Sequence, residues 1–277
     1  MEQGQQIGHH KIIRPLGKGG MGEVYLGEDT KLQREVALKF LPESVRKDPD
    51  RLARFRREAL AAAKLKHNNV ATIYALEDIE DTTFIVMEYV EGEKLSSHIP
   101  ADGMELDAFF DILLPLADGL AHAHSQGRIH RDLKPANIMF AREGIPKILD
   151  FGLARIEQDE IESANELGSG DETRTLDEQA PPSLTQRRSF LGTPAYMSPE
   201  QIEGKKVDAR SDLFSFGIVM YEAITGHRPF RGDNIESIIG RILTENSKSV
   251  TELRPVSPYT LRKIIRSALK KNRDLRI

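Results

Sequence analysis

The sequence predicts an α+β fold in which a strand-rich N-terminal part precedes a larger helical part, with a cleft between them. From His10 to Tyr89, short runs of β-branched and aromatic residues are separated by turn residues, which is typical of strands. After Gly92 the apolar residues recur at helical spacing instead. We therefore expect a small antiparallel sheet, a hinge at about 88–92 and a mostly α-helical part beyond it.

The N-terminal part is expected to contain five strands and one main helix. The strands are predicted where Val, Ile, Tyr and Phe gather, at 12–13, 24–26, 36–40, 71–74 and 84–87. The helix is predicted from about Pro49 to Leu65, because Phe55 and Ala59 begin an apolar stripe at helical spacing. The acidic residues near its start favour a helix N-terminus there.

Two helices stand out in the second part. Residues from Leu106 to Gln126 carry apolar side chains at helical spacing, despite Pro115 within the segment. The apolar run from Leu213 to Ile224 is too short to span a bilayer, so we expect a buried helix there and no transmembrane segment.

Charge is distributed unevenly along the chain. The formal net charge is −4, which does not indicate nucleic acid or an anionic membrane as the main partner. The stretch from Glu157 to Ser183 has nine acidic residues and one basic residue. Because it has few large apolar side chains, we expect it to be a mobile insertion. It is either a regulatory segment or a solvated insertion without a regulatory role.

Cysteine is absent, which excludes disulfide bonds, thiolate zinc sites and cysteine nucleophiles. The N-terminus lacks the apolar run of a secretory signal. A cytoplasmic location is therefore expected.

Two motifs carry oxygen ligands and a candidate base. The run His130-Arg131-Asp132-Leu133-Lys134-Pro135-Ala136-Asn137 is followed by Asp150-Phe151-Gly152. Asp132 can accept the proton of an attacking hydroxyl, and Asn137 and Asp150 can hold Mg²⁺ against the phosphates of a nucleotide. The combination predicts phosphoryl transfer.

A glycine-rich run, Gly17-Lys18-Gly19-Gly20-Met21-Gly22-Glu23-Val24, fits a loop that folds over phosphates. The same glycine spacing occurs in dinucleotide-binding folds, but there a helix begins within the motif. Here a strand is expected to follow. Lys18 is followed by Gly19 instead of Ser or Thr, so the run is no Walker A motif.

Together these motifs resemble the protein kinase superfamily. The resemblance implies a bilobal kinase fold in which residues 1–277 form one catalytic domain, with an N-lobe at about 10–89 and a C-lobe at about 93–277. It implies that Asp132 is the catalytic base and that Lys134 neutralises charge on the transferred group. Lys39 would contact the α- and β-phosphates and pair with Glu58 on the following helix.

The resemblance also assigns a nucleotide site. Its residues are those of the glycine-rich loop, the purine pocket, the hinge and the metal ligands, namely Gly17, Lys18, Gly19, Gly20, Gly22, Val24, Ala37, Lys39, Met87, Glu88, Val90, Met139, Asn137 and Asp150. Met87 would be the gatekeeper, and backbone groups of Glu88 and Val90 would bind the purine. Lys94 stands where many kinases have an acidic contact to the ribose.

Three further residues are expected to be structural. His130 resembles a packing residue that supports Phe151. Glu200 should pair with Arg276, because a buried carboxylate is unfavourable without a partner. Asp212 should anchor the backbone of the catalytic loop from the buried helix.

The resemblance is to serine/threonine kinases in particular, on the basis of Lys134 and the run from Gly192 to Glu200. When that run is extended through Gln201 and combined with residues 208–212, it resembles the bacterial branch of the family. The expected activity is transfer of the γ-phosphoryl group of ATP, with Mg²⁺ or Mn²⁺, to Ser and Thr of protein substrates in signal transduction. Autophosphorylation is expected within Thr173 to Ser189, at Thr185 or Ser189. Many bacterial relatives continue into a membrane segment and a sensor domain, so a larger, membrane-tethered protein is compatible with the resemblance.

Two other functions share parts of this pattern. A pseudokinase scaffold usually lacks one of the catalytic residues, whereas Lys39, Asp132, Asn137 and Asp150 are all present. A small-molecule kinase would lack the substrate-facing run at 192–200.

Overall fold

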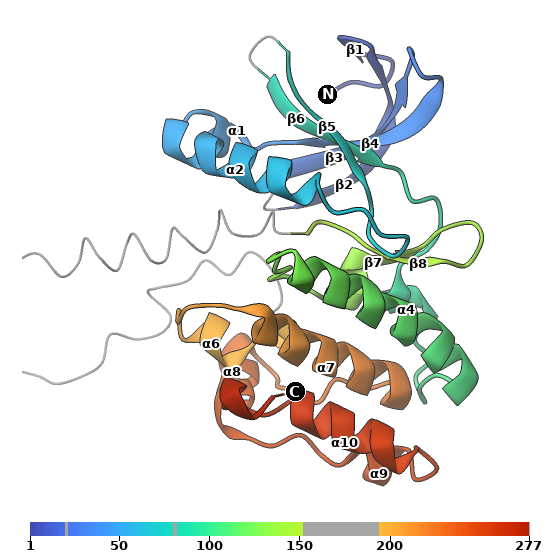
Figure 1. The fold of residues 1–277 in the computed structure, drawn as a ribbon, viewed down its shortest axis with the longest axis vertical. Helices are drawn as coiled ribbons and strands as arrows, with labels where there is room; N and C mark the ends of the chain where they lie inside the picture. Colours follow the sequence, from blue (N-terminus) through green and yellow to red (C-terminus); the bar gives the residue numbers. More distant parts are fainter. Residues whose placement is uncertain (20–21, 80–81, 152–193, 277) are drawn as a thin grey trace, which may run out of the picture.

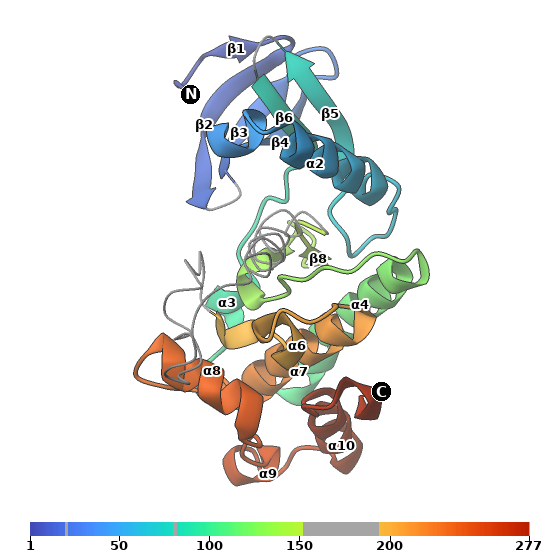
Figure 2. The same cartoon turned by 90° about the vertical axis from the view of Figure 1, so that its left-hand side faces the viewer.

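The computed structural model describes residues 1–19, 22–79, 82–151 and 194–276. A sheet with two helices forms one end of the molecule, and the remaining helices form the other end (Figures 1 and 2). The predicted order of a strand-rich part followed by a helical part is confirmed.

The sheet has six strands in the order β1-β2-β3-β4-β6-β5, and every neighbouring pair is antiparallel. The strands are β1 (Gln6–Ile7), β2 (His10–Gly19), β3 (Gly22–Asp29), β4 (Arg34–Phe40), β5 (Ile73–Ile79) and β6 (Thr82–Glu88). β1 was not predicted, since two residues are too few to show a periodic pattern. β5 begins and ends later than the expected strand at 71–74.

Alternation along the strands gives the sheet two apolar faces. On β4, Ala37 packs in a cluster with Phe55 and Ala59 of α2 (Pro49–Ala62), which crosses this face of the sheet (Figure 2). Val36 and Leu38 belong to a second cluster. Lys39 alternates with Leu38 and therefore lies on the same face as Ala37. This places the lysine beneath the sheet, toward the helical part.

The N-terminal part also contains the short helix α1 (Glu43–Arg46) before α2. Asp48 caps α2 by accepting hydrogen bonds from the backbone N–H groups of Asp50 and Arg51. The helix ends at Ala62, before the expected Leu65, although Leu65 is buried as predicted.

The helical part is organised around α4 (Leu106–Ser125) and α7 (Ala209–Thr225), close to the predicted segments. Thirteen of the 17 residues of α7 are buried, which agrees with the expected buried helix. The other helices are α3 (Leu95–His98), α6 (Pro199–Ile202), α8 (Ile235–Thr244), α9 (Val250–Leu253) and α10 (Tyr259–Ala268), with 3-10 turns at Pro135–Asn137, Pro194–Tyr196 and Arg273–Leu275. Within the described residues, no helix combines the length and hydrophobicity needed to cross a membrane.

A small hairpin of β7 (Ile138–Phe140) and β8 (Pro146–Ile148) lies between the two parts (Figure 1). Its strands are too short to be predicted from periodicity. The parallel bridge between Val70 and Ile148 ties β8 to the segment after α2. The amide of Phe140 donates to the carbonyl of Glu93, just after the hinge. The hairpin is therefore fixed to the hinge and to the segment between α2 and β5.

Candidate active site

The catalytic loop is held by one buried carboxylate on α7. Asp212 is fully buried, and its oxygens accept hydrogen bonds from the backbone N–H groups of His130 (2.7 Å) and Arg131 (2.8 Å). Its Oδ2 also lies 2.8 Å from Nε2 of His124. The predicted anchoring role of Asp212 is confirmed. Arg131 has a φ of 70°, an unfavourable conformation for a side chain of this kind that these bonds help to hold.

His130 has the predicted packing role. Its ring contacts Phe151 edge-on, with the centroids 4.8 Å apart. Nδ1 accepts a hydrogen bond from the N–H of Asp132, so Nε2 carries the proton that it donates to the carbonyl of Leu149 at 2.7 Å. Both nitrogens are therefore engaged, which leaves this histidine unsuited to proton transfer.

Asp132 lies in a polar cluster with the two other catalytic-loop residues that the sequence singles out. Lys134 Nζ is 2.9 Å and 2.7 Å from the two carboxylate oxygens. Nδ2 of Asn137 donates to the carbonyl and to Oδ2 of Asp132, at 2.8 and 2.9 Å. Because the amide nitrogen of Asn137 faces Asp132, its Oδ1 is left available as a metal ligand.

Asp150 is brought next to this cluster by the β7-β8 hairpin. Ile138 pairs with Ile148, and the N–H of Leu149 donates to the carbonyl of Asn137. The hairpin thus explains how two predicted metal ligands thirteen positions apart meet. Asp150 has a φ of 60°, a second left-handed conformation in this site.

Lys39 forms an ion pair with Asp150, with Nζ 3.0 Å from Oδ1. The lysine is 4% exposed, so a carboxylate partner offsets the loss of its hydration. Oδ1 of Asp150 is buried and, among the described residues, has no hydrogen-bond partner beyond this ionic contact. The N–H of Leu149, the neighbour of Asp150, donates to the carbonyl of Asn137, so a carboxylate and an amide oxygen of the kind that Mg²⁺ binds come from adjacent backbone segments.

Glu58, the expected partner of Lys39, lies on α2. It lines a pocket together with Arg131 and Phe151, between the helix and the catalytic loop. The Lys39–Glu58 pair stays a prediction.

The glycine-rich run covers the end of β2 and the start of β3, where Gly19 pairs with Gly22. A Cβ on Gly17 or Gly19 would meet no atom within 4 Å, whereas one on Gly22 would lie 1.8 Å from the carbonyl oxygen of Phe40. Gly17 and Gly19 therefore have open space beside their backbone, whereas Gly22 is required because a side chain there would clash with β4. Lys18 is exposed and pairs with Glu23 at 2.9 Å, and Gly20 lies outside the described residues.

The residues expected around the purine come from three elements. Ala37 and Met87 are buried in one cluster, against which Val24 packs, and Met139 lies on β7. The side chain of Glu88 is fixed by Lys147 (2.9 Å) and by the N–H of Thr72 (3.1 Å).

Val90 is 5% exposed, and within the described part of the chain its backbone N–H and C=O form no hydrogen bond. Unpaired backbone groups on a buried residue are uncommon. A ligand that both donates and accepts, as a purine does, would satisfy them. This arrangement fits the predicted hinge contact.

Arg276 forms the predicted ion pair with Glu200, through two hydrogen bonds of 2.6 and 2.9 Å. Burial raises the pKa of Glu200, but the hydrogen bonds from Arg276 and Ser211 outweigh it and hold the pKa below the usual range. The carboxylate is therefore charged at neutral pH.

One contact to the catalytic loop was not foreseen from the sequence. Nε2 of Gln201 donates to the carbonyl of Arg131 at 2.6 Å. The same side chain forms a capping box with Ser198 at the start of α6. The Ser-x-x-Gln spacing was a visible signal for the cap, although not for the contact to Arg131. Gly152, the acidic stretch 157–183, Thr185, Ser189 and Gly192–Thr193 lie outside the described residues.

Comparison with known proteins agrees with this geometry. The family described as "Protein kinase domain" matches residues 10–277. Serine/threonine-protein kinase PrkC of Bacillus subtilis is 36% identical over 266 residues, which cover 96% of this chain and 38% of that protein. Serine/threonine-protein kinase PknB of Mycobacterium leprae is also 36% identical over 266 residues, covering 94% of this chain and 39% of that protein. The chain thus spans less than two fifths of the length of these relatives.

The kinase domain of Mycobacterium tuberculosis PknI has the same fold. Its crystal structure superposes with a TM-score of 0.71 at 23% identity, covering 100% of this chain and 93% of that one. The predicted bilobal fold is confirmed. With the family match over residues 10–277, this shows that the chain belongs to the protein kinase family, alongside curated serine/threonine-protein kinases of bacteria.

Proposed function

We propose that this chain transfers the γ-phosphoryl group of MgATP to serine and threonine hydroxyls of protein substrates. The observation that carries the proposal is the convergence of Asp132, Lys134 and Asn137 with the Lys39–Asp150 pair at the junction of the two parts. Bound Mg²⁺ would neutralise charge on the phosphates, held by Oδ1 of Asn137 and the carboxylate of Asp150.

The roles of the other residues follow from their positions. Asp132 accepts the proton of the substrate hydroxyl, and Lys134, bonded to the same carboxylate, supplies positive charge near the transferred group. Lys39 binds the phosphates and Glu58 orients it. The glycine-rich loop covers the phosphates, and the free backbone groups of Val90 bind the purine.

The test is transfer of labelled phosphate from ATP to a generic protein acceptor in the presence of Mg²⁺, compared between the wild-type chain and Asp132→Asn. We expect phosphoserine and phosphothreonine with the wild type and a loss of transfer in the variant. ATP binding without transfer in the wild type would favour a scaffold. Transfer to small molecules alone would favour a small-molecule kinase.

We further propose regulation by autophosphorylation at Thr185 or Ser189, with Arg131 binding the phosphate. Support comes from the position of Arg131 beside Asp132 and from the fixation of its backbone by Asp212 and Gln201. Replacing both hydroxyl residues by alanine should remove the activation that follows preincubation with MgATP. Unchanged phosphate incorporation and unchanged turnover would contradict this regulation.

We propose ATP and Ser/Thr-containing protein substrates as the partners of the whole protein as well. A cytoplasmic location is proposed because ATP is available there and because the chain contains no cysteine. This location is compatible with tethering of the whole protein to a membrane through a segment outside this chain.

A further inference from the structure

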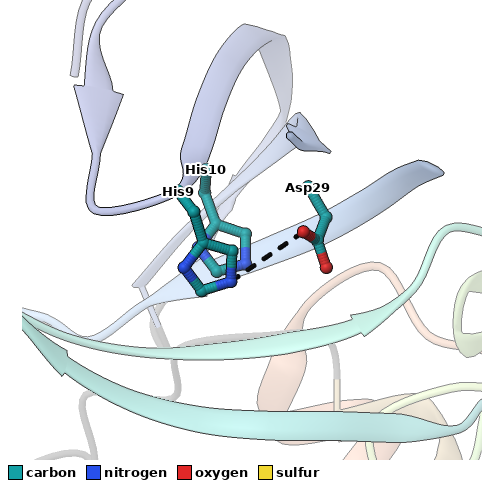
Figure 3. A group of neighbouring side chains, drawn as sticks. All are labelled: His9, His10 and Asp29. Carbon is teal, nitrogen blue, oxygen red and sulfur yellow. Dashed lines mark ion pairs between the residues drawn. The ribbon is translucent and has the colours of Figure 1, made fainter. Parts of the chain in front are cut away.

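Two histidines and an aspartate converge at the far edge of the sheet, away from the catalytic loop. His9 lies in the turn between β1 and β2, His10 begins β2, and Asp29 ends β3 (Figure 3). One ligand atom from each of the three side chains lies within 4.8 Å of the others. His9 Nε2 is 3.9 Å from Oδ1 of Asp29.

His10 is the unusual member of this group. It is 1% exposed, and its Nδ1 is buried without a hydrogen-bond partner in the part of the chain that the structure describes. The ring is held in place by Phe84, which it contacts edge-on at 5.6 Å, and by the ring of His9 at 4.1 Å. A buried imidazole nitrogen that binds nothing is unfavourable. The ring is therefore held in place with one nitrogen that no hydrogen bond from the described residues satisfies.

A similar grouping elsewhere in the chain shows the contrast. His67 stacks on His122 and lies 3.0 Å from Asp118. There Nδ1 of His67 accepts a hydrogen bond from the N–H of Asn69, while Nε2 contacts the aspartate. Both ring nitrogens are used, so hydrogen bonding alone accounts for this grouping. The same explanation does not cover His10.

Asp29 is oriented for a further contact. Its Oδ1 accepts hydrogen bonds from the N–H groups of Lys31 and Leu32, each 3.1 Å long. Arg34 approaches Oδ2 at 3.9 Å, but its guanidinium group lies over the ring of Tyr74, 3.7 Å from the centroid. The carboxylate is thus fixed in place and only loosely paired with the arginine.

The charges around His10 suit a bound cation. Asp29 and Glu77 both interact electrostatically with this ring. A neutral ring offers a lone pair, as coordination requires. The negative charges of Asp29 and Glu77 would offset part of the charge of a cation.

We propose that His9, His10 and Asp29 form a binding site for a divalent transition metal, of which Zn²⁺ fits best, with water completing the coordination. Two imidazoles and a carboxylate suit Zn²⁺, while Mg²⁺ prefers an all-oxygen set such as that in the cleft. Tetrahedral zinc at 2.0–2.1 Å separates its ligands by about 3.3 Å. Small side-chain rotations would bring the three atoms to that spacing.

The site would join the turn before β2 to the end of β3. Among the described strands β1 pairs with β2 alone, so a metal bridge here would add a further connection between the N-terminal segment and the lobe. Its effect is therefore expected on stability, with the catalytic loop unaffected.

The test is calorimetric titration of the chelator-treated chain with Zn²⁺ in excess Mg²⁺. We expect one Zn²⁺ per chain with a Kd of about 10 μM or lower. His9→Ala and Asp29→Asn should each weaken binding about tenfold or more. Asparagine retains the oxygen that accepts from Lys31 and Leu32, so the turn should persist. His67→Ala is the matched control and should bind Zn²⁺ as the wild type does.

A second measurement separates binding from misfolding. Zn²⁺ should raise the Tm of the wild type and of the His67 variant, and should leave the Tm of the His9 and Asp29 variants unchanged. Co²⁺ in place of Zn²⁺ should give visible absorption bands of a four-coordinate ion only in the first two proteins. Equal affinity in all four proteins, or no binding up to about 100 μM Zn²⁺, would overturn the proposal.

Discussion

At the scale of single residues, Asp150 combines an ion pair with Lys39 and a buried carboxylate oxygen that we propose binds Mg²⁺. Asp150→Asn removes the charge but keeps the side-chain volume. We expect turnover with MgATP to fall by at least about 100-fold, while the fold persists by circular dichroism. Asp118→Asn, an exposed aspartate paired with His67, is the control and should keep full activity. Near-normal turnover in the Asp150 variant would show that this carboxylate does not hold the metal.

Lys39 gives a second prediction at this scale. Lys39→Met fills a similar volume in the buried site without the ammonium group, so transfer should again fall by at least about 100-fold. The proposed purine contact at Val90 does not involve Lys39, so some ATP affinity should remain in equilibrium binding. Lys47→Met, which removes an exposed lysine paired with Glu43, should change neither quantity. Wild-type turnover in the Lys39 variant would require another phosphate anchor.

The grouping of the proposed catalytic residues was predictable because the sequence holds them in contiguous motifs. Asp132, Lys134 and Asn137 fall within six positions of the sequence, so their proximity in space follows from local chain geometry. The pairing of Lys39 with Asp150 was not predicted, since it depends on how the two parts close on each other. The contact from Gln201 to Arg131 spans 70 positions and has no local signal.

At the scale of elements, the β7-β8 hairpin and the hinge must approach closely. A Cβ on Gly92 would lie 1.9 Å from the carbonyl oxygen of Phe140, a backbone atom that cannot move alone. Gly92→Ala should therefore lower the free energy of unfolding by about 1–3 kcal/mol. It should also raise the KM for ATP, because the shifted segment follows Val90.

The control for this substitution is Gly240→Ala in α8. A Cβ there meets no atom within 4 Å, so alanine should stabilise the helix by about 0.5–1 kcal/mol. Urea unfolding and ATP titration of both variants measure the two effects. Equal stability of the Gly92 variant and the wild type would mean that the hinge can move away from β7 without loss.

The two longest helices were predicted well and the shortest elements were not. The segments at Leu106–Gln126 and Leu213–Ile224 contain enough turns for a 3.6-residue period to show, and α4 and α7 formed there. The strands of the β7-β8 hairpin have three residues each, which is too few to show a periodic pattern. Yet this hairpin brings the backbone next to Asp150 against Asn137, so the element that assembles the proposed metal ligands was the least visible in the sequence.

At the scale of the whole molecule, the Glu200–Arg276 pair joins α6 to the last described residues across 76 positions. Both side chains are buried, so removing one leaves the other charge without a partner. Glu200→Gln should lower the free energy of unfolding at pH 7 by about 3–5 kcal/mol. Glu43→Gln, which breaks an exposed pair with Lys47, should leave stability unchanged.

The same pair predicts how stability depends on pH. The pKa of Glu200 is lower in the folded chain than the ordinary value of 4.5, so the unfolded chain takes up a proton first as pH falls. The stabilisation is therefore present above pH 4.5 and is lost as pH falls through the lower folded pKa. Urea unfolding of the wild type and Glu200→Gln should show a stability difference that is constant from pH 7 to about 5 and shrinks below 4.5. A difference that stayed the same at pH 3 would show that the pair stabilises the fold through packing, with no contribution from the charge of Glu200.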